Sequence, residues 1–285
     1  MTTTAVSNAA TIARWNGAEA RQWITHADRY DAMLGSFGSR ALAAARLSPG
    51  DLVVDVGCGT GTTTLEAAWA VGRTGRVIGV DVSAPLLEVA TRRVEDWRAA
   101  ARVTLIRADA QTHPFLTGRA DAVISRFGLM LFADPVEAFA NLARALRAGG
   151  RLAFVTWQAA DRNTWFSAPH AALAEHVPVA APDDSGPCPF SLADPTRVHE
   201  ILDRAGFDSV RLESLTERAV LGSDVDDVVT FYEDVHGAAL RAALDAATVD
   251  RIVAGLRERL TPFLTPTGVR MPAAAWLVTA TRASA

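Results

Sequence analysis

The stretch Asp51-Leu-Val-Val-Asp-Val-Gly-Cys-Gly-Thr-Gly61 decides the fold of this 285-residue chain. Its first half predicts a buried β-strand, and the three alternating glycines that follow predict a tight turn. Residues 62–71 then carry apolar side chains at helical spacing and end at Gly72. Glycines let the backbone approach a ligand, and a helix N-terminus presents unpaired N–H groups. The stretch therefore predicts a site for a negatively charged or polar group.

Beyond residue 50, strand-like apolar runs alternate with stretches of helical periodicity. This alternation is typical of βαβ units and of a parallel sheet, so we predict an α/β fold. The expected strands are residues 51–56, 76–80, 103–106, 121–124, 152–156, 210–215 and 276–281.

Three segments lie outside the alternation: residues 1–49, 158–193 and 222–270. Loops of this length in a compact domain are usually lids or binding loops. We therefore expect four parts, which are an N-terminal helical lid (1–49), a cofactor-binding core (50–221) whose insert 158–193 is an acceptor lid, a helical insert (222–270) and a final core strand (271–285). The helical insert either covers the same sheet edge or supplies a dimer contact, which leaves a homodimer open.

The composition excludes several classes of function. The chain is 49% apolar and 21% charged, with a net charge of −4, and is close to the globular average. It has no lysine, which excludes Schiff-base chemistry, a pyridoxal-phosphate anchor and a P-loop lysine. Its two cysteines cannot build a cysteine-rich zinc site. No apolar signal region or membrane span is visible, so we expect a soluble, cytoplasmic protein with no membrane partner.

Three aspartates stand at or near the ends of the first three expected strands. Asp55 precedes the first glycine by two residues, where its carboxylate can brace the turn or accept a hydrogen bond from a ligand. Asp81 ends the second strand, twenty residues after Gly61, and is placed to accept both ribose hydroxyls. Asp109 ends the third strand, where a carboxylate can accept from an adenine amino group.

With these residues the chain resembles a known family. The segments Val53 to Gly61, Ile78-Gly-Val-Asp81 and Arg107-Ala-Asp-Ala110 are similar to those of class I S-adenosylmethionine-dependent methyltransferases, in particular the ubiquinone/menaquinone-biosynthesis-like branch that acts on small molecules. The resemblance implies a Rossmann-like, seven-stranded, mostly parallel sheet with an antiparallel last strand and helical lid additions. It also implies S-adenosylmethionine as the cofactor and S-adenosylhomocysteine as a product.

The resemblance also implies roles for individual residues. The turn containing Gly57, Cys58, Gly59 and Gly61 would hold the methionine part of the cofactor. Asp81 would bind the ribose, with Val82 against the adenine and Asp109 and Ala110 at the adenine edge. Ser125 and Arg126 would flank the methionine and the sulfonium. No metal is implied.

The acceptor and the chemistry leave a weaker trace in the sequence. Among six histidines, His170 is the weak catalytic candidate, because it lies on the insert after the fifth strand. Trp157, Trp165, Phe166 and Phe190 form either an apolar acceptor pocket or ordinary core. The acidic chain lacks a basic stripe, so we expect a small hydrophobic metabolite and no nucleic acid. Whether oxygen, nitrogen or carbon is methylated stays open.

Two other functions are compatible with parts of this pattern. A nicotinamide-dependent oxidoreductase also uses glycines and a strand-end acid, but its G-x-G-x-x-G spacing differs from the G-x-G-x-G found here. A cofactor-binding regulator or scaffold without transfer activity would keep the same motifs. Because no motif is broken, we favour an active methyltransferase.

Overall fold

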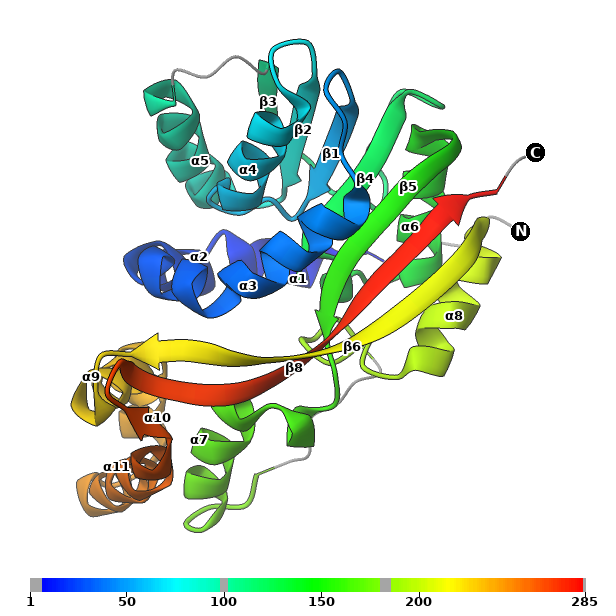
Figure 1. Cartoon of the computed structure of the whole chain (residues 1–285). Coiled ribbons are helices and arrows are strands. Elements are labelled where there is room, and N and C mark those ends of the chain that lie inside the picture. The colour runs from blue at the N-terminus through cyan, green and yellow to red at the C-terminus, as the bar shows by residue number, and fades with distance from the viewer. Residues whose placement is uncertain (1–6, 98–101, 180–185, 284–285) are drawn as a thin grey trace.

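The computed structural model describes residues 7–97, 102–179 and 186–283. Its sheet has the strand order β3-β2-β1-β4-β5-β8-β6, and the short β7 pairs with β8 (Figure 1). Strands β1 to β5 pair in parallel, whereas β8 is antiparallel to both neighbours. This confirms the predicted Rossmann-like sheet. The strands are β1 (Leu52–Val56), β2 (Arg76–Asp81), β3 (Arg102–Arg107), β4 (Ala120–Arg126), β5 (Leu146–Trp157), β6 (Phe207–Gly222), β7 (Leu264–Thr265) and β8 (Gly268–Arg282).

The centre of the sheet is apolar on both faces, because helices pack against each side. Val53 is fully buried and stands between Val77 of β2 and Ala122 of β4, both also fully buried. The β-branched side chains of this region suit a pleated surface that is covered on both sides.

Three helices of the core begin at a side-chain cap. Ser83, Asp134 and Asp194 each accept a hydrogen bond from a backbone N–H of the first turn, and each is followed by a proline in that turn. The helices of the core are α4 (Thr62–Val71), α5 (Ala84–Asp96), α6 (Pro135–Ala145) and α8 (Pro195–Arg204).

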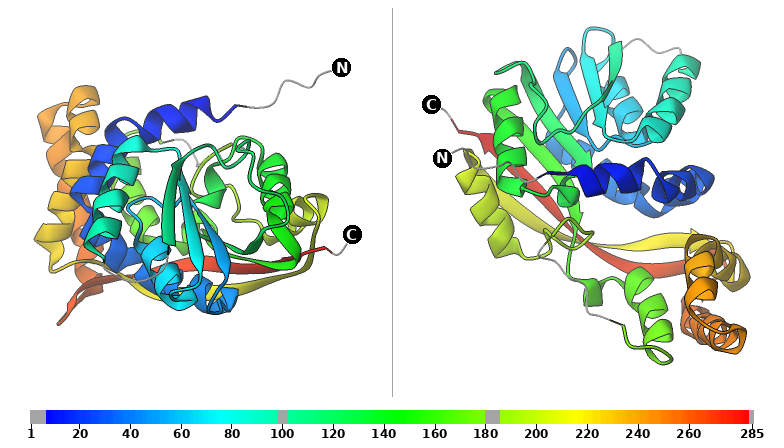
Figure 2. Two further views of the ribbon diagram at one scale, coloured as in Figure 1. Left: turned by 90° about the horizontal axis from the view of Figure 1, so that it is seen from above. Right: turned by 180° about the vertical axis from the view of Figure 1, so that it is seen from behind.

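The N-terminal segment forms three helices, α1 (Ala9–Trp15), α2 (Ala18–Thr25) and α3 (Ala27–Ala45). α1 is hydrogen-bonded to the loops after β2 and β3, α2 packs against α5, and α3 packs against β4, β5, β6 and β8. Figure 2 shows these helices from two further sides. α3 buries Met33, Phe37 and Ala41 in the main core. The helical character that the sequence predicts for residues 1–49 is therefore present, although residues 1–6 lie outside the described part.

Strands β6 and β8 form a hairpin much longer than the predicted runs at 210–215 and 276–281. Their register extends from Phe207 opposite Arg282 to Gly222 opposite Val269. Residues 268–275 are rich in alanine and contain Pro272, so they give a weak strand signal. The proline is tolerated because Pro272 pairs with Arg218 of β6 alone: β5 pairs with β8 only from Ala275 onward, and β7 pairs with it only at Gly268 and Val269.

The far end of this hairpin holds the remaining helices (Figure 1). They are α9 (Val225–Tyr232), α10 (Ala238–Ala243) and α11 (Ala246–Leu260), with α7 (Thr164–Ala174) from the earlier insert packed against α11. A π-helical turn, Glu233–Gly237, joins α9 to α10. In the described part of the chain, no helix has both the length and the apolar character needed to span a bilayer.

The close approach of two glycines at the sheet edge yields a prediction. A Cβ on Gly128 would lie 2.6 Å from the Val56 carbonyl oxygen and 2.9 Å from Gly57 Cα. Gly128→Ala should therefore lower the free energy of unfolding by about 1–3 kcal/mol, as overpacking does. The matched control is Gly35→Ala in α3, where a Cβ meets no atom within 4 Å and helix propensity should stabilise the fold by up to ~1 kcal/mol.

Urea unfolding of both variants measures these two changes. Equal effects of the two substitutions would contradict the close contact at Gly128.

Candidate functional site

The glycine turn after β1 is shaped by three positive φ angles with different causes. Gly57 has φ +68° and packs so closely on Gly128 that a Cβ would lie 2.8 Å from its Cα. Gly59 has φ +54°, and a Cβ there would meet no atom within 4 Å, because the residue faces the cavity. Gly61, at φ +88°, is the N-cap of α4 and packs against Ala90. Of the three, Gly57 and Gly59 line the cavity.

Asp81 joins the turn to the end of β2. Its Oδ2 accepts the backbone N–H of Gly59 at 2.8 Å, and its Oδ1 accepts that of Ser83 at 2.8 Å. Both carboxylate oxygens keep lone pairs beyond these bonds. Desolvation raises the pKa of Asp81, and hydrogen bonds from the backbone of Ser83, Gly59 and Val82 oppose that rise. Asp81 and the adjacent Val82 both line the cavity.

Asp109 occupies the corresponding place beyond β3. Its two oxygens accept from Asn8 Nδ2 at 3.0 and 2.9 Å, and its Oδ1 also accepts the Gln111 N–H at 2.9 Å. Asp109 and Ala110 line the cavity beside Asp81. The structure thus brings together the two strand-end aspartates that the sequence singles out.

Asp55 lies inside the sheet and does not line the cavity. It is 1% exposed, and its Oδ2 accepts the Thr64 hydroxyl at 2.6 Å. Its Oδ1 has no hydrogen-bond partner among the described residues. Burial raises the pKa of Asp55 to about 7, although the Thr64 bond opposes the rise. Asp55 therefore braces the start of α4 and holds an unsatisfied oxygen near the turn.

Three further predicted residues take different positions. Cys58 is buried, and its Sγ packs toward Gly79 rather than into the cavity. Ser125 is also buried, since its Oγ donates to the Val56 carbonyl at 2.7 Å and accepts the Gly128 N–H at 3.1 Å. Arg126 does line the cavity. Cys58 and Ser125 thus support the shape of the turn from behind.

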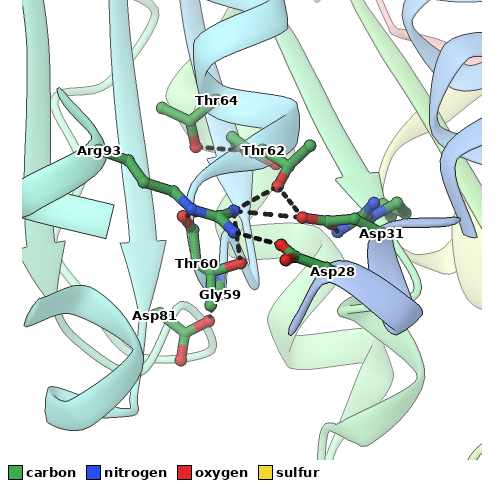
Figure 3. Close-up of polar contacts among 10 residues, drawn as sticks. Asp28, Asp31, Gly59, Thr60, Thr62, Thr64, Asp81 and Arg93 are labelled. Atoms are coloured by element: carbon green, nitrogen blue, oxygen red, sulfur yellow. Dashed lines mark hydrogen bonds and ion pairs between the residues drawn. The ribbon is translucent and has the colours of Figure 1, made fainter. Parts of the chain in front are cut away.

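An ionic network fastens α3 to the glycine turn, and Figure 3 labels its members Asp28, Asp31 and Arg93. Arg126 belongs to the same network. Asp31 of α3 accepts from Arg126 at 2.9 Å, from Arg93 at 3.2 Å and from the Thr62 hydroxyl at 2.8 Å. Arg93 also forms a longer ion pair with Asp28, at 3.9 Å. Because the Arg126 side chain is only 10% exposed, this pairing fixes its position at the cavity wall.

The cavity at this edge measures about 550 Å³ and extends from the two aspartates into an aromatic region. Phe127 there has a left-handed backbone, φ +59°, which is rare for a bulky residue and is found at functional sites. Its ring stacks on Trp157 at 4.0 Å. The aromatic residues that line the cavity are Trp15, Trp23, Tyr30, Phe127, Phe132, Trp157 and Trp165.

The predicted aromatic cluster divides between the cavity and the core. Trp157 and Trp165 line the cavity, whereas Phe166 and Phe190 pack behind Trp165. The indole N–H of Trp15 is buried in this wall and has no partner among the described residues. The aromatic region therefore contains a buried hydrogen-bond donor that has no partner in the described part of the chain.

Two histidines differ in their relation to the cavity. His170, the predicted candidate, lies on α7, packs on Phe166 and is not among the lining residues. His236 lies in the π-helical turn and does line the cavity, together with Val235. Desolvation lowers the pKa of His236, which favours the neutral imidazole. The insert 222–270 thus reaches the same sheet edge as the glycine turn.

The amino-acid sequence is similar to those of known methyltransferases. Residues 53–150 match the family described as a methyltransferase domain. The chain is 36% identical over 113 residues to demethylmenaquinone methyltransferase of Lactiplantibacillus plantarum, covering 40% of this chain and 48% of that protein. It is 29% identical over 177 residues to the ubiquinone/menaquinone biosynthesis C-methyltransferase UbiE of Pseudomonas aeruginosa, covering 59% of this chain and 69% of the relative.

Over residues 53–150 the chain is similar to a methyltransferase domain. The solved structure of phosphoethanolamine N-methyltransferase 2 from Haemonchus contortus, to which the chain is similar, contains S-adenosylhomocysteine. The chain spans 33 to 69% of the length of the first curated relatives it matches. The matched segment runs from the glycine turn through the strand-end aspartates, so the sequence and the geometry select the same part of the methyltransferase domain.

Solved structures confirm the fold of the methyltransferase domain. The chain superposes on phosphoethanolamine N-methyltransferase 2 of Haemonchus contortus with a TM-score of 0.53 and 20% identity, covering 86% of this chain and 53% of that one. It superposes on the [4+2]-cyclase SpnF with a TM-score of 0.51 and 18% identity, covering 87% of this chain and 81% of that one. Because both identities are low, the likeness concerns the fold alone.

The buried Asp55 yields a prediction about pH. Its pKa is about 7 in the fold and 3.8 in its ordinary range, so the folded state keeps a proton that the unfolded state loses. The contribution of Asp55 to the free energy of unfolding is therefore fully present below about pH 4 and is lost as pH rises toward 7. Asp55→Asn cannot titrate, so the variant should gain stability relative to the natural protein between pH 5 and 8.

The matched control for this prediction is Asp121→Asn, because hydrogen bonds from Arg147 and Leu52 lower the pKa of Asp121. The stability that ionised Asp121 contributes is lost only as pH falls toward its pKa. The free energy of unfolding of Asp121→Asn should therefore differ from that of the natural protein by the same amount at pH 5 and at pH 8. Urea unfolding at pH 5 and at pH 8 measures how far each variant differs from the natural protein in its free energy of unfolding. A constant difference for Asp55→Asn would contradict the raised pKa.

Proposed function

We propose that the protein transfers a methyl group from S-adenosylmethionine to a small acceptor with an apolar body, giving S-adenosylhomocysteine. The observation that carries the proposal is the pair Asp81 and Asp109, which stand at the ends of β2 and β3 beside the glycine turn. They line one end of a cavity whose other end is aromatic. Ligands of open parallel sheets bind outside the carboxyl ends of the strands, which is where this cavity lies.

The lone pairs at this edge suit an adenosine. Asp81 keeps free lone pairs on both oxygens, which fits two vicinal ribose hydroxyls. Asp109 Oδ1 already accepts two bonds and its Oδ2 one, so Oδ2 keeps a site for an adenine amino group. Gly59 leaves room for the close approach of the amino-acid part, and Arg126 stands on the wall beside it.

The bound cofactor supplies an electrophilic methyl group on a sulfonium. What this chain contributes is mainly alignment of the acceptor and exclusion of water. The stacked Phe127 and Trp157 present an aromatic wall that suits both an apolar acceptor and a cation. We therefore propose that the aromatic end of the cavity holds the acceptor, with the N-terminal helices and the insert 158–193 as its cover.

An oxygen or nitrogen acceptor must also lose a proton, and we propose His236 as the group that takes it. His236 is the histidine among the described residues that lines the cavity. It stands on a π-helical turn, a feature frequent at functional sites, and its lowered pKa keeps it neutral near pH 7. The lone pair of the acceptor attacks the methyl carbon, the carbon–sulfur bond breaks toward sulfur, and the proton passes to the imidazole.

Two alternatives have specific tests. A cofactor-binding protein without transfer would bind S-adenosylmethionine and leave it unchanged in the presence of every acceptor. The likeness to a [4+2]-cyclase shows that this fold is not restricted to proteins described as methyltransferases. A nicotinamide-dependent enzyme would bind NAD or NADP instead. Screening a metabolite library for release of S-adenosylhomocysteine separates transfer from both.

The ribose assignment predicts the effect of Asp81→Ala. Charge-assisted hydrogen bonds contribute about 1.5–3 kcal/mol each, and 1.4 kcal/mol corresponds to a tenfold change in affinity. Calorimetry should therefore show S-adenosylhomocysteine binding at least tenfold more weakly to the variant than to the natural protein. Asp224→Ala, an exposed cap at the start of α9, is the control and should leave the affinity unchanged.

The proton-acceptor assignment predicts a different pattern for His236→Gln. For any oxygen or nitrogen acceptor found in the screen, turnover should fall at least tenfold while the affinity for S-adenosylhomocysteine stays within twofold. His170→Gln serves as the control and should keep turnover, because His170 does not line the cavity. If instead His170→Gln abolished turnover and His236→Gln did not, the assignment would be reversed.

A further inference from the structure

The short helix α1 lies across the two loops that carry the strand-end aspartates. Its N-cap is Asn8, whose side chain makes no cap hydrogen bond, and its C-cap is Asn16, whose amide nitrogen donates to the Ile12 carbonyl at 2.7 Å. Each asparagine also reaches one of the loops, so the helix is fastened at both ends. Between them, Thr11 and Trp15 line the cavity.

Asn8 makes the tighter attachment. Its amide nitrogen donates to both oxygens of Asp109, at 3.0 and 2.9 Å, and to Gln111 Oε1 at 3.0 Å. Its own oxygen accepts the backbone N–H of Ala133 at 2.7 Å. Asn8 is only 5% exposed, so these bonds are shielded from water. The attachment joins α1 to the end of β3 and to the start of α6.

Asn16 holds the other end of α1 to the loop after β2. Its amide nitrogen donates to the Val82 carbonyl at 3.0 Å, and its oxygen accepts the Ala84 N–H at 3.0 Å. Asp81 precedes Val82 directly. Each attachment of α1 therefore lies on, or one residue from, an aspartate that we assign to the adenosine.

We propose that α1 is a strap over the adenosine subsite, and that Asn8 and Asn16 are positioning residues that couple cofactor binding to closure of the aromatic wall. This inference rests on the proposed function. The bonds from Asn8 orient the Asp109 carboxylate and leave one lone pair on Oδ2. The strap therefore selects the carboxylate orientation that an adenine amino group needs.

Closure of the strap also completes the acceptor end. Trp15 is the last residue of α1, and its ring meets Trp23 edge to face at 5.6 Å, while Trp23 stacks on Tyr30 at 4.0 Å. When α1 is detached, Trp15 leaves this wall. A ligand that favours the closed strap therefore also favours the complete aromatic wall, which orders the acceptor after the cofactor.

The test measures the dissociation rate of S-adenosylhomocysteine by surface plasmon resonance, with adenosine as a second probe. Asn8→Ala and Asn16→Ala should each raise the dissociation rate at least tenfold for both probes, because each releases one end of the strap. Ser7→Ala is the matched control, since Ser7 is exposed and adjacent to Asn8, and its rate should stay within twofold.

Hydrogen exchange of the α1 amides gives a readout that a purely structural role would not move. S-adenosylhomocysteine should slow this exchange in the natural protein and have a much smaller effect in the asparagine variants. The two variants act on different loops, so loss of folding in one leaves the other to decide. Dissociation rates raised less than tenfold in the folded variants, or α1 exchange unaffected by the ligand in the natural protein, would overturn the strap. Failure of the natural protein to bind S-adenosylhomocysteine would instead refute the proposed function.

Discussion

The hydrogen bond from the Gly59 N–H to the Asp81 carboxylate joins the ends of β1 and β2, and the arrangement of the site depends on it. It fixes a turn whose residues need left-handed backbone at Gly57 and Gly59. It also orients a half-buried carboxylate that lines the cavity. The glycine turn also positions the start of α4, where the Thr64 hydroxyl donates to the buried Asp55. One strand-end contact therefore links the sheet, the helix and the proposed ribose subsite.

The N-terminal helices convert this sheet edge into an enclosed site. Asp31 of α3 pairs with Arg126 and Arg93, so the longest of these helices is anchored on both sides of the glycine turn. From this anchor, α2 and α1 extend over the ends of β2 and β3 and bring tryptophans to the cavity (Figures 1 and 2). The same helices thus contribute to stability and to the proposed acceptor wall.

Local sequence signals predicted the core of the sheet and the positions of the strand-end aspartates. The caps at Ser83, Asp134 and Asp194 and the apolar runs of β1 to β5 depend on neighbouring residues, which a single sequence displays. Other features depend on contacts between distant segments. Asn8 lies 101 residues from Asp109, and Phe127, whose backbone is left-handed, stacks on Trp157, thirty residues further along the chain. The histidine that reaches the cavity, His236, is placed by the long β6–β8 hairpin, whose alanine-rich second strand gives little signal.

The central claim is that this sheet edge binds the adenosine of S-adenosylmethionine between the glycine turn and α1. The most direct measurement is a crystal structure of the protein with S-adenosylhomocysteine. Our account predicts both ribose hydroxyls within hydrogen-bond distance of Asp81, the adenine amino group at Asp109 Oδ2, and α1 closed over the ligand. A ligand bound elsewhere, or an adenosine at this edge without contact to either aspartate, would contradict it.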